Sequence, residues 1–244
     1  MMPASYAMRR AAAVLTNNRQ DLVEYPQWIH FTASTRPRLP CTLYLPSRLS
    51  ANPRILVSVH GVSRNADEHV GLFRQFAERY NIVLLAPTFA PDAFRDYQRL
   101  GRTGYGPRAD LALIRLLNEV AARTGWDTSK VDMFGFSGGA QFAHRFTFVH
   151  PQRLRRLVLG SAGWYTMPDM SVAYPYGIAD ATGLDAARMN AISAVQLPTL
   201  VAVGRQDDNA NDAELNRSKV INREQGRNRL ERARRWTRAM DAFA

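Results

Sequence analysis

The sequence predicts an α/β protein with a mostly parallel sheet flanked by helices. Short apolar runs rich in β-branched residues end at Gly or Pro, and stretches with helical spacing lie between them. No repeat, low-complexity block or flexible linker divides the 244 residues, of which 46% are hydrophobic. A chain of this length and composition can bury one sizeable core, so we expect a single domain over residues 1–244.

Strands and helices are expected to alternate along the chain. The expected strands cover residues 41–45, 55–60, 82–86, 131–136, 157–160 and 200–203. The expected helices cover residues 65 or 66–80, 109–124, 138–149 and 229–244, and the irregular segment 162–195 is interpreted as a short cap or lid. In open sheets of this kind, ligands bind beyond the carboxyl ends of the strands.

The chain is strongly basic, with a formal net charge of +11, and most of its positive charge is arginine. The arginines are scattered except for a cluster within 223–238. A nucleic-acid site would require such a cluster on one face with interleaved aromatic side chains. We interpret it instead as the solvated face of a helix, and no nucleic-acid partner is expected.

Two further features concern location. No apolar stretch is long enough for a transmembrane helix, and the apolar run within residues 1–20 is too short for a secretory signal, so no membrane association is expected. Cys41 is the single cysteine, which excludes an internal disulfide. The sequence therefore suggests a cytoplasmic protein of undetermined oligomeric state.

The strongest local motif is Gly-Phe-Ser-Gly-Gly at residues 135–139, a G-x-S-x-G sequence. A predicted strand precedes it and a predicted helix follows it, which is the setting of a nucleophile elbow. The serine of such an elbow has a strained backbone, and its neighbours must be small where the chain reverses. The motif therefore predicts Ser137 as a nucleophile.

A serine nucleophile needs two donors for the oxygen of its tetrahedral intermediate. One is expected from the N–H of Gly138, the residue after the serine. The other is expected from the His-Gly-Val-Ser sequence at 60–63, which leaves an earlier strand; Val62 is the first candidate and Ser63 the second. The same sequence is also compatible with a simple strand-ending turn in which His60 is hydrogen-bonded internally.

These residues resemble the α/β-hydrolases, specifically the esterase and polyhydroxyalkanoate-depolymerase-like group. The resemblance rests on the 60–62 and 135–139 motifs and on Gly-Arg-Gln-Asp at 204–207, and it extends from about residue 42 to the end. It implies hydrolysis of a small-molecule or polymeric carboxylic ester through an acyl-serine, without metal or organic cofactor. It also implies Asp207 as the triad acid, with Asp208 as the alternative.

The triad histidine is not evident. The order in this fold is serine, acid, histidine, and none of the five histidines follows Asp207. A crossover helix at 229–244 would normally lead to one more parallel strand. We therefore expect a chain that is incomplete at its C-terminus, lacks the final strand and is nearly inactive.

Substrate contacts are expected from His60, Trp164 and Tyr165, although the two aromatic residues could equally pack as extra core. Two functions compete with ester hydrolysis. One is a non-catalytic protein of the same fold that binds a ligand or partner, which the absent histidine favours. The other is acyl transfer to an acceptor other than water.

Overall fold

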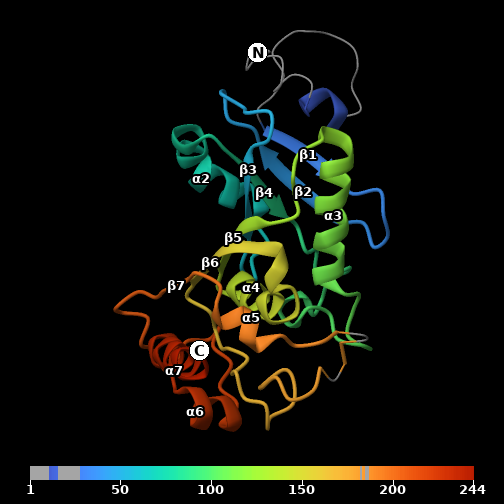
Figure 1. Cartoon of the computed structure of the whole chain (residues 1–244). Helices are drawn as coiled ribbons and strands as arrows, with labels where there is room; N and C mark the ends of the chain where they lie inside the picture. The colour runs from blue at the N-terminus through green and yellow to red at the C-terminus, as the bar shows by residue number, and fades with distance from the viewer. Residues whose placement is uncertain (1–10, 16–27, 182, 185–186) are drawn as a thin grey trace.

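Seven strands form one mixed sheet in the computed structural model, which describes residues 11–15, 28–181, 183–184 and 187–244 (Figure 1). The strands are β1 (Trp28–Thr32), β2 (Pro40–Tyr44), β3 (Arg54–Val59), β4 (Ile82–Pro87), β5 (Val131–Phe136), β6 (Leu154–Gly160) and β7 (Thr199–Ala202). Their order is β1-β2-β4-β3-β5-β6-β7. The first two strands pair antiparallel, β2 pairs antiparallel with β4, and the remaining pairs are parallel. The predicted mostly parallel sheet is confirmed.

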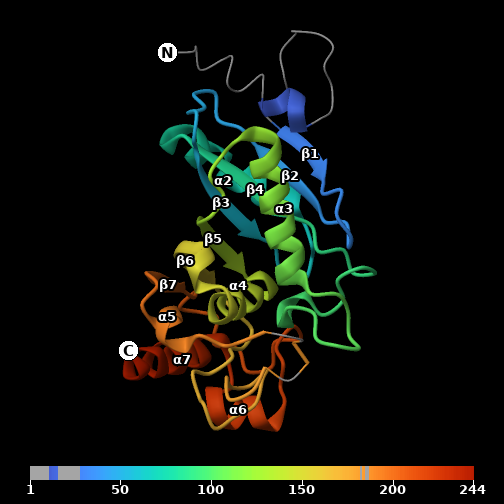
Figure 2. The ribbon, with the colours of Figure 1, turned by 45° about the vertical axis from the view of Figure 1, so that its right-hand side comes forward.

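Helices cover both faces of the sheet, unequally. They are α2 (Ala66–Tyr80), α3 (Ala109–Thr124), α4 (Gly138–Val149), α5 (Ala191–Val195), α6 (Lys219–Gln225) and α7 (Arg229–Phe243), with short 3₁₀ turns at Tyr97–Arg99 and Pro151–Arg153. In Figures 1 and 2, α2 lies on one side of the sheet and α3 and α4 on the other. The main core lies on the α3 and α4 side, where Val57, Met133, Leu113 and Phe142 are buried together.

The chain reverses direction across the sheet between β3 and β5. From β3 it crosses through α2 to β4, and from β4 it crosses through α3 to β5 on the other side of β3. Right-handed crossovers in opposite directions place their helices on opposite faces and leave a crevice at the strand ends. The loops after β3 and β5 meet at this point.

The predicted elements agree with the structure to within a few residues, and three elements were missed. β1, α5 and α6 were not expected, and β6 begins at Leu154 rather than at residue 157. The prediction about residues 1–20 lies largely outside the described residues.

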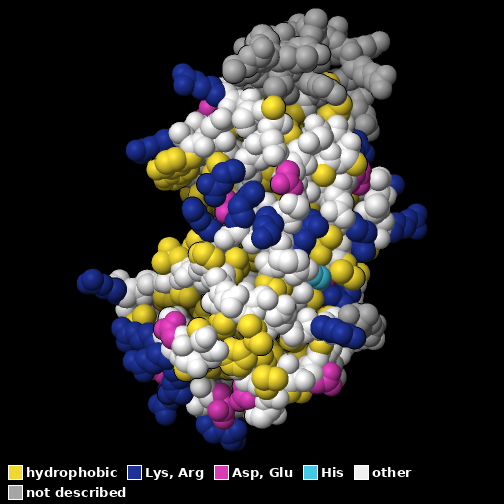
Figure 3. Space-filling view, viewed as in Figure 1, with side chains coloured by type: hydrophobic (Ala, Val, Ile, Leu, Met, Phe, Trp, Pro, Cys, Tyr) yellow, Lys and Arg dark blue, Asp and Glu magenta, His cyan; other side chains and the backbone are white. Residues whose placement is uncertain are grey.

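The C-terminal arginines fall into two groups. Figure 3 shows Lys and Arg side chains spread over the visible face, with one group near α6 and α7 at the lower left. Most of the cluster is exposed, as expected, but Arg229 and Arg232 are buried. Arg232 donates to three backbone carbonyls, those of Gly226, Gly163 and Asn216, so it holds loops together rather than facing solvent.

None of the helices in the described ranges combines the length and the apolar character that crossing a bilayer requires.

Candidate active site

Ser137 lies at a sharp reversal between β5 and α4. Its backbone angles are φ 50° and ψ −110°, a region that non-glycine residues rarely adopt. Its N–H donates to the Gly160 carbonyl at 2.8 Å, and its carbonyl accepts from the Gln141 N–H at 3.1 Å. These two bonds fix the strained residue between β6 and the first turn of α4, with its side chain partly exposed.

The glycines around Ser137 are required by close backbone contacts. A Cβ on Gly135 would lie 2.3 Å from the Gly139 carbonyl oxygen, and a Cβ on Gly139 would lie 2.0 Å from the Val59 carbonyl oxygen. Backbone atoms cannot move aside cheaply, so both positions exclude larger residues. The sequence motif therefore corresponds to a real steric requirement at this reversal.

The loop after β3 reaches the same point. A Cβ on Gly61 would be in ordinary contact with the Ser137 Cβ, at 3.5 Å, and a Cβ on Gly138 would lie 3.3 Å from a Val62 methyl group. In the described part of the chain, no hydrogen bond uses the N–H of Val62 or of Gly138. One predicted oxyanion donor thus lies in the loop after β3 and the other at the start of α4, and neither N–H is engaged elsewhere in the described residues.

The His60 side chain is buried and hydrogen-bonds the backbone of this loop, and it does not line the cavity. Its Nδ1 lies 2.9 Å from the Gly61 carbonyl oxygen, and its Nε2 accepts from the Phe89 N–H at 3.0 Å. A carbonyl only accepts and an N–H only donates, so the ring carries its proton on Nδ1. Burial lowers the pKa of His60 to about 4, which keeps the ring neutral.

A cavity of about 560 Å³ opens beside Ser137. Its lining includes Gly61, Val62, Ser63, Asn65, Glu68, His69, Leu72, Phe73, Phe134, Phe136 and Ser137. The aromatic and aliphatic side chains form most of the wall, while the backbone of the two loops and a few polar groups lie near the serine. A cavity of this size at the switch point of a parallel sheet can accept a small organic ligand.

None of the five histidines, which all lie in the described residues, hydrogen-bonds Ser137. His144 is fully buried, with Nδ1 on the Ala140 carbonyl and Nε2 accepting from the Thr166 N–H. His150 bonds Asp110, and His30 lies against Thr42. His69 borders the cavity, but its Nδ1 lies 2.8 Å from the Ser58 hydroxyl on β3.

The predicted acid Asp207 pairs with an arginine. Its carboxylate accepts from Arg229 at 3.1 Å, and Arg229 also contacts Asp212. Asp208 is exposed. Burial first, and then the charge of Asp207, raise the pKa of Tyr165 above its usual range. Both aspartates lie in the loop after β7, and Asp207 pairs with Arg229.

Trp164 and Tyr165 do not line the cavity beside Ser137. Tyr165 is fully buried and stacks on Trp236, with ring centroids 5.0 Å apart. Trp164 is 3% exposed and lies under the Arg145 guanidinium, 4.2 Å from the ring centroid. The prediction that these two residues contact substrate is therefore replaced by the alternative, in which they pack as core.

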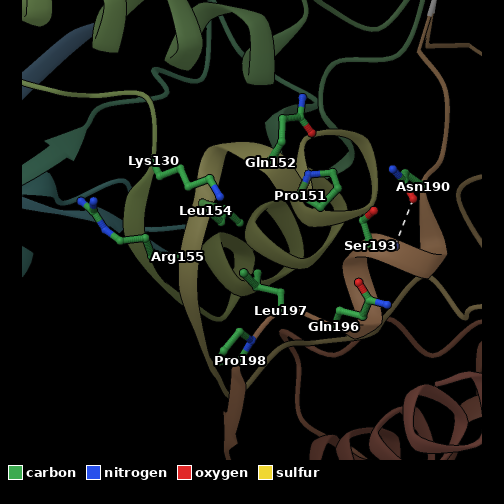
Figure 4. Close-up of a pocket in the computed structure, with 10 residues that line it drawn as sticks. All are labelled: Lys130, Pro151, Gln152, Leu154, Arg155, Asn190, Ser193, Gln196, Leu197 and Pro198. Carbon is green, nitrogen blue, oxygen red and sulfur yellow. Dashed lines mark hydrogen bonds between the residues drawn. The ribbon is translucent and has the colours of Figure 1, made fainter.

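A second hollow, of about 430 Å³, lies at the opposite end of β6 (Figure 4). Leu154 at the start of β6, Pro198 before β7, and Lys130 border it. Asn190 lies at its edge and caps the first turn of α5 through Ser193. It faces the amino ends of the strands, away from Ser137, so it is not part of the candidate active site. Within the described ranges, no three His, Cys, Asp or Glu side chains are grouped to hold a metal ion.

Two solved structures have a similar arrangement of elements. The poly(aspartic acid) hydrolase-1 of Sphingomonas sp. KT-1 is 26% identical, with a TM-score of 0.78 over 90% of this chain and 86% of that chain. The chain has the α/β-hydrolase fold. A poly(3-hydroxybutyrate) depolymerase from Bordetella parapertussis, 22% identical, has a TM-score of 0.76 over 98% of this chain and 83% of that chain. The α/β-hydrolase fold predicted from sequence is confirmed.

Sequence comparison also finds hydrolases. Feruloyl esterase B of Talaromyces funiculosus is 28% identical over 113 residues, which is 45% of this chain. Feruloyl esterase B of Talaromyces stipitatus is 26% identical over 113 residues. Each match covers 32% of the esterase, so the chain spans about a third of the curated relatives it matches. No family model matches the chain. The similarities confirm the predicted resemblance to esterases of the α/β-hydrolase fold.

Tyr97 and Gln98 lie beside Gly138, a proximity that the sequence analysis did not predict. The Tyr97 hydroxyl and the Gln98 amide nitrogen lie 2.6 Å and 2.9 Å from the position of a Cβ on Gly138. Both come from a 3₁₀ turn within the long loop that follows β4. This loop has no motif in the sequence, and nothing distinguished Tyr97 from the other aromatic residues of the loop, Phe89, Phe94 and Tyr105.

Proposed function

We propose that this protein hydrolyses carboxylic esters through an acyl intermediate on Ser137. The observation that carries the proposal is the strained backbone of Ser137 at the β5–α4 reversal, beside the cavity and the Gly61–Val62 loop. Strained residues persist only where the surrounding structure enforces them, and they concentrate at functional sites. The sequence similarity to two feruloyl esterases supports the same reaction class.

In this proposal the Ser137 hydroxyl oxygen attacks the ester carbonyl carbon and loses its proton. The carbonyl oxygen becomes negative in the tetrahedral intermediate, where the N–H groups of Val62 and Gly138 stabilise it. The amino terminus of α4 adds a favourable dipole at the same place. The intermediate then collapses to the acyl-serine and the released alcohol, and water later hydrolyses the acyl group.

The proton of Ser137 needs an acceptor, and we propose that the 244-residue form is slow because no histidine supplies one. The contacts of His60, His144 and His150 with other groups support this view. Disruption of a serine hydrolase triad lowers turnover by about a millionfold. The oxyanion hole and the binding site alone can still leave about 10³- to 10⁴-fold catalysis over water.

The cavity supports an apolar or aromatic group on the ester. Leu72, Phe73, Phe134 and Phe136 form its wall, and 48% of the Phe136 side chain is exposed. We propose small-molecule or polymeric esters as substrates, with Asp207 as the acid and segment 162–195 as the cap of one domain. No metal or organic cofactor takes part in the proposed reaction.

A second candidate is a non-catalytic protein that binds a ligand in the same cavity. The engagement of the histidines elsewhere favours this alternative. It predicts stoichiometric binding of an ester without any chemistry at Ser137, whereas the hydrolase predicts an acylated serine.

The test is hydrolysis of p-nitrophenyl butyrate by the 244-residue protein and by Ser137→Ala, with Ser129→Ala as the matched control. Ser129 is exposed at the opposite end of β5, so its substitution should leave the rate unchanged. We expect slow turnover, an acyl group on Ser137 by mass spectrometry, and loss of that acylation in Ser137→Ala. Turnover independent of Ser137 would refute the proposed function, while fast Ser137-dependent turnover would refute the proposed impairment alone.

A further inference from the structure

The carbonyl oxygen of Gly61 is held by three donors. The Tyr97 hydroxyl donates to it at 2.9 Å, the His60 Nδ1–H at 2.9 Å and the Arg64 N–H at 3.2 Å. The same Tyr97 hydroxyl lies 3.1 Å from the His60 carbonyl. Both side chains are fully buried, so these bonds lie on the inner side of the loop.

The Gly61 carbonyl and the Val62 N–H belong to the same peptide group, so the orientation of the carbonyl fixes that of the N–H. The Gly61–Val62 peptide is trans, and in a planar trans peptide the N–H points opposite to the carbonyl. Because the Gly61 carbonyl points inward to Tyr97 and His60, the Val62 N–H points outward. The cavity and Ser137 lie on this outer side of the loop, and Val62 is 49% exposed.

We infer that Tyr97 and His60 are positioning residues that orient the Val62 N–H and so build one half of the oxyanion hole. The inference rests on the proposed function, since it assigns a role within the same reaction. Neither side chain touches substrate. Each acts through the Gly61 carbonyl.

Packing around Tyr97 is consistent with this role. Its ring stacks on Phe89 at 5.2 Å between centroids, and the Phe89 N–H is the donor to His60. The Gln98 amide nitrogen and the Tyr97 hydroxyl lie beside the same position, 2.9 Å and 2.6 Å from a Cβ on Gly138. The Gln98 carbonyl in turn accepts from the buried Arg145 of α4 at 2.8 Å. The turn that carries Tyr97 is thus fixed to the helix that begins after Ser137.

The experiment compares Tyr97→Phe with Tyr80→Phe in the full 244-residue protein. Tyr97→Phe keeps the ring and removes only the hydroxyl, and Tyr80 is an exposed tyrosine at the end of α2 that serves as the matched control. Steady-state kcat and KM are measured for p-nitrophenyl butyrate and for the corresponding thionoester, in which sulfur replaces the carbonyl oxygen. Urea unfolding verifies that each variant is folded.

Loss of one oxyanion donor costs about 100- to 1,000-fold in kcat, and a misdirected donor should cost less. We expect Tyr97→Phe to lower kcat by about 10- to 100-fold with KM changed less than about twofold, and to reduce the preference for oxygen over sulfur. An unchanged kcat, or a loss seen only in KM, would overturn the inference. If Tyr97→Phe does not fold, Gln98→Leu at a half-buried position gives the same readout, and we expect a smaller loss in kcat.

The two proposals fail in different ways. If acylation and turnover do not depend on Ser137, the proposed function fails before Tyr97 is tested. If they depend on Ser137 and both Tyr97→Phe and Gln98→Leu retain the wild-type kcat and oxygen preference, only the positioning role fails.

Discussion

At the scale of single residues, Gly139 beside Ser137 and Gly71 on α2 have very different surroundings. A Cβ on Gly139 would lie 2.0 Å from the Val59 carbonyl oxygen and 2.6 Å from the His60 carbonyl oxygen. Gly71, on the exposed side of α2, has as its nearest neighbour a Trp28 ring atom at 3.7 Å. The same substitution to alanine should therefore have opposite effects at the two positions.

We expect Gly139→Ala to lower the free energy of unfolding by about 1–3 kcal/mol or more, because the backbone must shift to admit the methyl group. Gly71→Ala should raise it by about 0.5–1 kcal/mol, because alanine restricts the unfolded chain and favours helix. Urea unfolding of both variants at pH 7 measures the difference. Equal effects of the two substitutions would contradict the steric account of the reversal.

The residue scale also shows what the sequence could predict about the site. Ser137 and Gly138 were predicted from the elbow motif, which imposes small neighbours within five consecutive positions, and Val62 from the His-Gly-Val-Ser sequence that follows a predicted strand. Tyr97 acts through a backbone carbonyl 36 residues away in sequence. No spacing rule describes such a contact. Trp164 and Tyr165 were misplaced because aromatic composition alone does not separate a pocket wall from a core.

At the scale of elements, a buried ion cluster joins the start of α3 to the end of α4. Asp110 is fully buried, accepts from Arg108 through two nitrogens, and lies 2.8 Å from the His150 Nε2. Burial alone would raise the pKa of Asp110, but the hydrogen bonds from His150 and Arg108 outweigh it and lower the pKa below 3.8. The carboxylate is therefore more stable in the folded protein than in the unfolded chain.

This cluster predicts an acid-sensitive contribution to stability. A carboxyl whose pKa is lower in the folded state stabilises the protein fully above its unfolded pKa, and the effect is lost as the pH falls through the folded pKa. We expect Asp110→Asn to lower the free energy of unfolding by about 1.5–3 kcal/mol at pH 7, since it removes the charged acceptor of the hydrogen bonds from Arg108 and His150. The loss should shrink as the pH falls below about 4, where the carboxyl of the unfolded chain binds its proton, and it should vanish once the pH is below the folded pKa.

Urea unfolding between pH 3 and pH 7 tests the prediction, with Asp92→Asn in an exposed loop as the control. A loss that stays constant over this range would show that Asp110 contributes through packing and not through its charge.

The elements also explain which parts of the fold the sequence revealed. The central strands were predicted well, because buried parallel strands are continuous apolar runs ended by Gly or Pro. β1 was missed because only every second residue of Trp28–Thr32 is buried, over five residues that include His30. α6 was missed because Lys219–Gln225 buries only Ile221 and Gln225. Short elements with few buried residues leave too weak a periodic pattern.

At the scale of the whole molecule, part of one face of the sheet is exposed in the described residues. α2 packs on β2, β3 and β4, and its Phe73 contacts Phe134 with ring centroids 5.0 Å apart. Beyond this contact, Phe136 on β5 and Leu200 on β7 lie on the same face and are 48% and 61% exposed. β7 pairs only with β6, so in the described part of the chain its other edge has no partner strand. An exposed apolar edge strand is a template for association with other chains.

The exposed apolar face around Phe136 and Leu200 predicts that copies of the protein associate with one another. A charged residue introduced at position 200 should weaken this association. We expect the average mass of the protein in sedimentation velocity to rise with concentration, and Leu200→Lys to reduce that rise, because the ammonium group would have to be desolvated in the contact. Ile192→Lys on α5 is the matched control, since Ile192 is also largely exposed but lies outside the sheet. Leu200→Lys should leave stability nearly unchanged, as exposed substitutions usually do. A wild-type protein that stays monomeric at all concentrations, or equal effects of the two lysines, would show that the uncovered face does not drive association.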